Sequence, residues 1–210
     1  MGKSYRVYFA GGLFTHKDLI GNAYLADEIQ RCSNGKFKCL LPQNIEFRSM
    51  NPKSIRDDDI VALLESDLAI FNYDGTELDS GTVVEYMFAK FADIPTLIMR
   101  SDFRDAGDCG TPETPMPWNL MTSFYPRTKT YVVSSAEIYR RSGKDCQKMS
   151  EYMAKEIVPL LESLLQTKPT MKKEEQEQIY DWLTRMPNFS EDRTQEIKTA
   201  LAKKKSSGLL

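Results

Sequence analysis

Residues 68–73, Leu-Ala-Ile-Phe-Asn-Tyr, form a short and almost wholly apolar run that stops at Asp74 and Gly75. A run of this length and composition is typical of a central strand in a parallel sheet, because helices cover such a strand on both faces. An Asp-Gly pair is a turn signal, so the strand is expected to end there. The stretch predicts a buried parallel strand and, with it, an α/β fold.

Strand-like and helix-like segments alternate on both sides of this run. Aromatic and β-branched stretches predict further strands, and apolar residues at helical spacing predict helices between them. Right-handed helical crossovers place such strands in one parallel sheet with helices on both faces. We therefore expect a three-layer α/β sandwich with a five-stranded parallel sheet of the Rossmann or flavodoxin-like kind. The expected strands are 4–10, 37–41, 68–73, 95–99 and 131–133, and the expected helices are 17–31, 54–65, 81–92 and 145–165.

The composition changes after Lys168 and Pro169, where charged, helix-forming residues dominate. Two further helices are expected there, over 172–186 and 190–205, each with a thin apolar stripe. This change divides the chain into a sheet-containing domain over 1–167 and a short helical C-terminal extension over 168–210. Its last small residues, 206–208, are expected to be disordered.

The charge balance argues against a nucleic-acid partner. The chain has 28 Lys and Arg against 30 Asp and Glu, a net charge of -2, whereas binding to a phosphate backbone needs a basic surplus. No segment approaches the roughly 18 consecutive apolar residues of a membrane span, and the N-terminus has no signal-peptide pattern. We expect a cytoplasmic protein with no nucleic-acid or membrane partner. Arg100 and Arg104 are expected to be solvated loop residues.

The residue inventory disfavours metal and cofactor sites. The four cysteines include no CxxC pair, and His16 is the single histidine, so a zinc site is not expected. Gly11-Gly12 matches neither the dinucleotide nor the triphosphate fingerprint. Because Ser-His and Cys-His nucleophiles both need an imidazole base, acid–base chemistry falls mainly to carboxylates. We expect no metal and no cofactor.

One carboxylate lies where a ligand is expected. Ligands of open parallel sheets bind beyond the carboxyl ends of the strands, and the segment 74–85 follows such an end. Ser80-Gly81-Thr82 opens a helix whose amide groups face that region, and Glu85 follows on an otherwise apolar helix face. Glu85 is either a helix-start carboxylate stabilised by the helix dipole or a nucleophile that cleaves a glycosidic bond together with a second carboxylic acid. Candidate partners are Asp59, Asp67, Asp74 and Asp79.

Four segments together resemble one enzyme family. They are 8–15 (Tyr-Phe-Ala-Gly-Gly-Leu-Phe-Thr), Asp59 followed eight residues later by Asp67-Leu-Ala-Ile, 79–85 (Asp-Ser-Gly-Thr-Val-Val-Glu) and 119–121 (Asn-Leu-Met). In this order and at these spacings they are similar to the nucleoside 2-deoxyribosyltransferases, over about residues 4–165. The resemblance implies transfer of a 2-deoxyribosyl group between nucleobases. It also implies two small-molecule partners, a deoxynucleoside and a free nucleobase.

The resemblance implies catalytic roles for three residues. Glu85 matches the nucleophile that attacks C1′ and holds the sugar as a covalent glycosyl-enzyme. Asp59 matches the acid that protonates the departing base. Tyr8 matches the tyrosine that hydrogen-bonds and orients the nucleophile. The implied reaction requires no metal.

The resemblance also implies the substrate-binding residues. Asp79 and Asn119 match the pair that binds the 5′-hydroxyl, the asparagine coming from a neighbouring subunit. A homo-oligomer, a dimer or larger, with shared active sites is therefore expected. Phe14 matches an aromatic residue that packs near the base. The expected binding set is Gly11, Gly12, Phe14, Asp79, Gly81, Asn119 and Met121.

Two other functions fit the same sequence. A 2′-deoxynucleoside 5′-phosphate N-hydrolase has the same fold and glutamate, but its sugar passes to water. That sister family tends to have serines around the 5′-phosphate where this chain has Asp79 and Asn119. A carboxylate beside a phosphate is repulsive, which favours nucleosides over nucleotides. A non-catalytic nucleoside or nucleotide sensor is the third possibility, because fold alone does not fix function.

Overall fold

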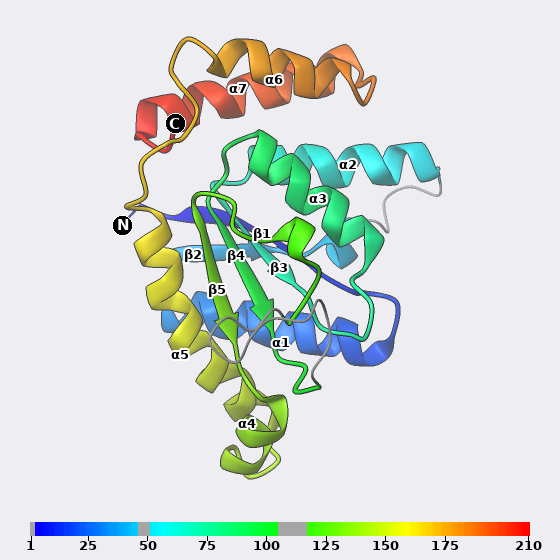
Figure 1. Cartoon of the computed structure of the whole chain (residues 1–210), viewed down its shortest axis with the longest axis vertical. Coiled ribbons are helices and arrows are strands. Elements are labelled where there is room, and N and C mark those ends of the chain that lie inside the picture. Colours follow the sequence, from blue (N-terminus) through cyan, green and yellow to red (C-terminus); the bar gives the residue numbers. More distant parts are fainter. Residues whose placement is uncertain (1–2, 46–50, 105–116) are drawn as a thin grey trace.

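The computed structural model describes residues 3–45, 51–104 and 117–210. It contains one five-stranded sheet with strand order β2-β1-β3-β4-β5, in which every neighbouring pair is parallel (Figure 1). This order confirms the predicted five-stranded parallel sheet and is that of the flavodoxin-like folds. The strands are β1 (Tyr5–Ala10), β2 (Phe37–Leu40), β3 (Leu68–Asn72), β4 (Thr96–Arg100) and β5 (Thr128–Val132).

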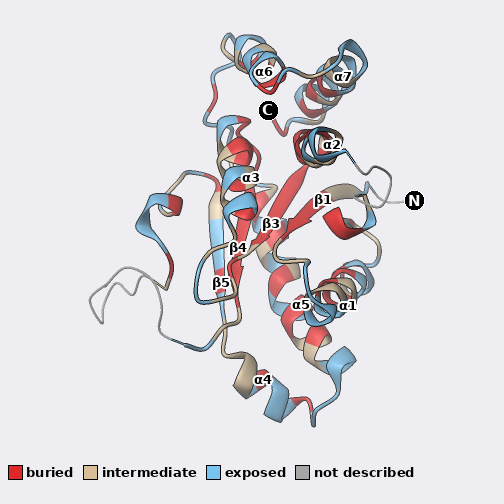
Figure 2. Ribbon diagram, turned by 90° about the vertical axis from the view of Figure 1, so that its right-hand side faces the viewer, coloured by how far each residue is buried: buried red, intermediate tan, exposed pale blue. Residues whose placement is uncertain are grey.

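Helices cover both faces of the sheet, as the predicted three-layer sandwich requires. Two lie on one face and two on the other, and Figure 2 shows the buried strands between them. The first face is covered by α1 (His16–Cys32) and α5 (Cys146–Leu164), and the second by α2 (Pro52–Glu65) and α3 (Ser80–Phe91). The short helix α4 (Ser135–Arg141), which precedes α5, was not predicted from the sequence.

Alternation along the strands divides the core into two clusters. In β1, Val7 and Phe9 join the cluster under α1 and α5, whereas Tyr8 and Ala10 join the cluster under α2 and α3. All four side chains are almost completely buried. Successive residues of a strand point to opposite faces, so Tyr8 is directed from the centre of the sheet toward the layer that contains α3.

The C-terminal hairpin, formed by α6 (Gln176–Arg185) and α7 (Glu191–Ser207), lies on the outer side of α2 and α3 (Figures 1 and 2). Most of its short apolar stripe is buried, because Leu183, Ile197 and Leu201 lie in the same cluster as Tyr8, whereas Trp182 is 55% exposed. The hairpin therefore adds a further helical layer to the sandwich.

The chain end is ordered, so the expectation of disorder at 206–208 was wrong. Helix α7 continues to Ser207 and ends at Gly208, whose φ of 76° is accessible to glycine without strain. The Leu209 amide donates to the Lys204 carbonyl at 3.0 Å, and the side chains of Leu209 and Leu210 are buried. Arg127 donates to the Leu209 carbonyl at 3.0 Å, which attaches the chain end to the residue before β5.

Lys204 is buried between α7 and α2. Its side chain is 2% exposed, and its Nζ donates to the Leu64 carbonyl at 2.6 Å. Burial lowers the pKa of Lys204 from 10.5 to about 7. Between these two pH values the unfolded chain binds more protons than the folded protein, so the contribution of Lys204 to stability rises with pH.

We expect Lys204→Met to flatten the pH dependence of stability. The unfolding free energy of the parent should rise between pH 7 and 10, and the variant should lose up to about 1.4 kcal/mol per pH unit of that rise. Part of the rise should persist, because burial also lowers the pKa of Lys90 to about 7. Urea unfolding across this range measures the effect, with the exposed neighbour Lys203→Met as the control. If the unfolding free energies of the parent and of Lys204→Met changed with pH in the same way, the expected contribution of Lys204 would be contradicted.

None of the helices in the described ranges is long and apolar enough to cross a membrane.

Candidate functional site

Tyr8 and Glu85 meet directly. The Tyr8 hydroxyl donates to Glu85 Oε1 at 2.6 Å. Tyr8 is fully buried at the centre of β1, and Glu85 is half-buried on α3. A short hydrogen bond from a phenol to a carboxylate fixes the orientation of the carboxylate. Glu85 is thus a carboxylate held in one orientation by a rigid strand.

Helix α3 begins at a fixed point because Asp79 caps it. Asp79 Oδ2 accepts hydrogen bonds from the Thr82 amide at 2.7 Å and from the Thr82 hydroxyl at 2.9 Å. A β-carbon on Gly81 would lie 3.2 Å from Asp79 Oδ2, so the absence of a side chain leaves room for this cap. The cap fixes the start of α3 and thereby the place of Glu85 one turn later. Asp79 therefore has a structural role besides the binding role predicted for it.

The glycine pair after β1 permits close packing of two strand ends. A β-carbon on Gly11 would lie 2.8 Å from the Asn72 β-carbon, a distance that no real contact tolerates. The Gly12 carbonyl accepts a hydrogen bond from Asn22 at 3.0 Å, which joins the turn to α1. Gly11 is therefore required where the carboxyl ends of β1 and β3 come together.

Four of the predicted binding residues are exposed, one of which is Gly81 in the first turn of α3. Phe14 is 80% exposed before α1, and Met121 is 68% exposed. Asn119 is exposed as well, and its side chain accepts a hydrogen bond from the Met121 amide at 2.9 Å. The neighbouring Trp118 is buried and anchors this segment. Its ring packs in a T-shaped arrangement with the ring of Tyr73, and the two ring centroids are 5.7 Å apart.

Asp59 lies on α2, the helix that packs beside α3. It is half-buried, with the buried Asp57 and Ile60 close to it in sequence. Asp59 is the eighth of the fourteen residues of α2 and lies near the middle of the helix. The structure thus brings Tyr8 and Glu85 into contact and places Asp59 on the neighbouring helix α2.

Two of the four candidate partner carboxylates are occupied elsewhere. Asp67, buried before β3, accepts a hydrogen bond from the Arg6 amide at 2.8 Å. Asp74 accepts from the amides of Ser101 and Asp102 at 2.5 and 2.8 Å, and so joins the loops after β3 and β4. Both carboxylates hold the backbone in place, and a third candidate, Asp79, caps α3.

Arg100 is not the solvated loop residue expected from the sequence. It is the last residue of β4 and is 1% exposed. Its Nη1 donates to the Tyr73 carbonyl at 2.5 Å, and its Nη2 lies 4.0 Å from Asp102. Arg104 is exposed and ion-pairs with Asp102, as a solvated residue does. The only sequence signal for burial of Arg100 was its place directly after an apolar strand.

A groove of about 790 Å³ lies away from Glu85, between α6 and α7. It is lined by Tyr180 and Leu201 together with charged residues, of which Glu177 and Lys205 pair with each other at 2.9 Å. The lining also includes Lys198 and Asp181, and Asp181 ion-pairs with Arg185 at 2.8 Å. Within residues 3–45, 51–104 and 117–210, no three His, Cys, Asp or Glu side chains gather as a metal site.

Comparison with known sequences gives one family. The sequence model described as nucleoside 2-deoxyribosyltransferase matches residues 7–121, more than half of the chain. The matched range includes Tyr8, Asp59, Glu85 and Asn119. No curated protein matches the chain significantly.

Solved structures with a similar fold come from several organisms. A conserved protein from Enterococcus faecalis V583 is 26% identical with a TM-score of 0.51, and the alignment covers 71% of this chain and 99% of that one. A 2-deoxyribosyltransferase from Leishmania mexicana is 23% identical with a TM-score of 0.47, covering 63% and 92%. A 2-deoxyribosyltransferase from Bacillus psychrosaccharolyticus is 13% identical with a TM-score of 0.42, covering 49% and 77%.

Proposed function

The chain belongs to the nucleoside 2-deoxyribosyltransferase family, and on that premise we propose that it passes a 2-deoxyribosyl group from one nucleobase to another through a covalent Glu85 intermediate. The observation that carries the proposal is the contact of 2.6 Å between the Tyr8 hydroxyl and Glu85. A nucleophilic carboxylate must present one oxygen at a fixed angle to the sugar. A buried tyrosine on a central strand supplies that constraint.

The proposed reaction has two steps. In the first, a Glu85 oxygen forms a bond to C1′ while the C1′–N bond breaks. The bonding electrons pass to the base nitrogen, or to its conjugated ring, which takes a proton from Asp59. In the second, a nitrogen of the incoming base attacks C1′, Glu85 departs as a carboxylate, and the proton of the incoming base returns to Asp59. Two inversions at C1′ give net retention.

Tyr8 acts on the nucleophile rather than on the sugar. Its hydrogen bond at 2.6 Å orients the nucleophile, and it also stabilises the carboxylate as a leaving group in the second step. Full burial of Tyr8 excludes rotation of the ring away from α3. Tyr8 is therefore proposed as a part of the catalytic machinery.

The function is tested by mixing deoxyinosine with adenine and separating the products. Transfer predicts deoxyadenosine and hypoxanthine in equal amounts. Free deoxyribose formed at the same rate with or without adenine would instead show hydrolysis of the nucleoside. Release of the base from deoxyadenosine 5′-monophosphate but not from deoxyinosine would identify the N-hydrolase, and cleavage of neither would identify a sensor.

We expect the parent protein to prefer deoxyadenosine to its 5′-monophosphate. Asp79 can accept a hydrogen bond from a neutral 5′-hydroxyl, whereas a phosphate beside it costs about 1–4 kcal/mol at surface-like dielectric. The double variant Asp79→Ser, Asn119→Ser should shift the ratio of kcat/KM values toward the monophosphate by about tenfold or more. Serine is also a good N-cap, so α3 should keep its start.

The control for this comparison is Glu77→Ser, which removes an exposed carboxylate two residues before Asp79. It should leave the ratio near that of the parent. A parent protein that prefers the monophosphate would contradict the nucleoside assignment and favour the N-hydrolase reaction.

Asn119 is proposed to complete the site of a neighbouring subunit in a homo-oligomer. Exposed apolar side chains next to it support this proposal, since Leu120, Met121 and Phe124 are 51%, 68% and 85% exposed. Apolar side chains gathered on one short segment are typical of surfaces that a partner covers. A second copy of this chain is the partner that the family resemblance implies.

A further inference from the structure

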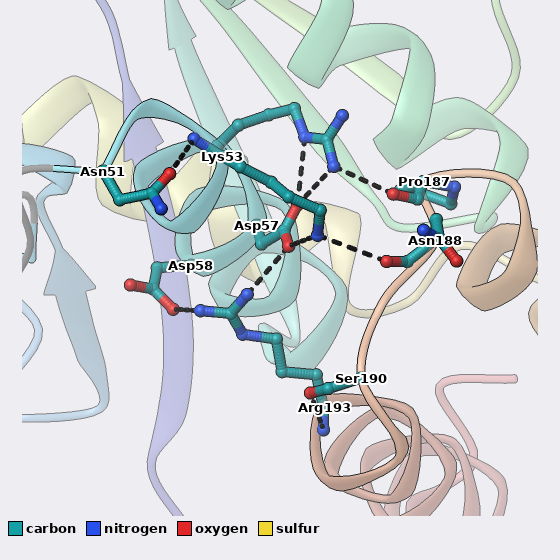
Figure 3. A network of polar contacts seen from close by, with 9 residues as sticks. Asn51, Lys53, Asp57, Asp58, Pro187, Asn188, Ser190 and Arg193 are labelled. Atoms are coloured by element: carbon teal, nitrogen blue, oxygen red, sulfur yellow. Dashed lines mark hydrogen bonds and ion pairs between the residues drawn. The ribbon is translucent and has the colours of Figure 1, made fainter.

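Asp57 is a fully buried carboxylate at the junction between α2 and the C-terminal hairpin (Figure 3). Its two oxygens ion-pair with Lys53 at 2.6 Å, Arg56 at 2.5 Å and Arg193 at 2.8 Å. Burial alone would raise the pKa of Asp57, but the hydrogen bonds from Lys53 and Arg56 hold it below its ordinary value. Asp57 is therefore a charged, fully partnered group inside the protein.

The three cations do different things. Lys53 and Arg56 belong to α2 itself and could neutralise Asp57 without the hairpin. Arg193 belongs to α7, and it also binds the next carboxylate, Asp58, at 2.6 Å. One guanidinium thus bridges two consecutive residues of α2, which fixes the helix against rotation as a single contact would not.

Further contacts join the same two elements. Arg56 donates to the Pro187 carbonyl at 2.8 Å, and Lys53 donates to the Asn188 carbonyl at 3.2 Å (Figure 3). At the other end of α2, Lys204 donates to the Leu64 carbonyl. The hairpin therefore holds α2 near both of its ends.

Asp59 directly follows Asp57 and Asp58, the two aspartates that Arg193 binds. Successive residues of an α-helix are about 100° apart, so Asp57 and Asp59 project about 200° apart, on nearly opposite faces of α2. The hairpin lies on the Asp57 face, and the face with Asp59 is directed away from it. A rotation of α2 by roughly 10° would move a carboxylate roughly 5 Å from the helix axis by roughly 1 Å. Errors of that size can cost a reaction about 10²-fold.

We propose that Arg193 is a positioning residue, which holds α2 through Asp57 and Asp58 so that Asp59 meets the departing base. This inference rests on the proposed function, in which Asp59 is the general acid. It gives the C-terminal hairpin a part in the reaction although none of its residues touches the substrate. The hairpin lies beyond residue 121, where the family match ends.

The test compares two substrates that differ in their need for an acid. The base of 7-methyl-2′-deoxyguanosine is cationic and leaves without protonation, whereas that of deoxyinosine needs a proton. For Arg193→Met we expect kcat/KM to fall about 10- to 100-fold with deoxyinosine, because acid assistance contributes about 10²- to 10⁴-fold, and less than about threefold with the methylated nucleoside. Arg193→Lys, which keeps the charge, should recover part of the loss.

A variant that only destabilises the chain separates positioning from folding. Ile157→Val changes a fully buried residue on the opposite side of the sheet and should affect both substrates equally. Equal losses for Arg193→Met with the two substrates, or no loss with either, would overturn the positioning role while leaving the proposed function standing. A parent protein that cleaves neither substrate would overturn both.

Discussion

Replacing Glu85 with Gln is expected to abolish transfer and leave the protein folded. The amide cannot form the glycosyl ester, so kcat should fall by about 10³-fold or more. The Gln side chain has the same shape and its carbonyl can still accept the hydrogen bond from Tyr8, so the packing of β1 against α3 should not change. Transfer of deoxyribose from deoxyinosine to adenine measures the activity, and thermal unfolding measures the stability.

The control for this change is Glu77→Gln, which alters an exposed glutamate on the segment before α3. It should retain the activity of the parent. If Glu85→Gln unfolds at the parent's Tm and keeps more than a few per cent of the activity, Glu85 is not the nucleophile.

The second large effect is expected from Asp59→Asn. Without a proton donor, cleavage of deoxyinosine should slow by about 10²- to 10⁴-fold, the range that general acids contribute. Cleavage of 7-methyl-2′-deoxyguanosine should slow far less, because its base leaves without protonation. Rapid-mixing measurement of base release gives the rate of the first step for each substrate.

Asp27→Asn is the matched control, since Asp27 is an exposed aspartate of α1 on the opposite side of the sheet. It should change neither rate. Losses of equal size for the two substrates in Asp59→Asn would mean that Asp59 positions the substrate and does not protonate the base.

The sheet was predictable because its strands carry strong local signals. The apolar run 68–73 became β3 (Leu68–Asn72), and the turn at Gly11 follows β1 as expected. Helix α4 was missed because its seven residues include a single buried apolar side chain, Ile138, so no periodic stripe marks it. The order of the chain end was missed because small residues at a terminus look disordered, while Arg127 and the buried Leu209 lie far apart in sequence.

The site was predictable only in part. The resemblance to a family pointed to Tyr8 and Glu85, and the structure confirms that they touch. No local pattern showed that Asp79 would cap α3 or that Arg100 would be buried, since both depend on packing between distant segments. The ion pair between Arg193 and Asp57 joins residues that are 136 positions apart. The sequence alone shows only two charged helices and does not indicate that they meet.

The covalent intermediate is the central claim, and trapping it is the most direct measurement. A 2′-deoxy-2′-fluoro arabinonucleoside should react with the parent protein and release its base, because the fluorine slows both steps but leaves the first able to proceed. Mass spectrometry of the digested protein should then find one fluorinated sugar on the peptide that contains Glu85, and none in Glu85→Gln. A parent protein that converts deoxyinosine and adenine yet never acquires this mass, or acquires it on another residue, would contradict the account.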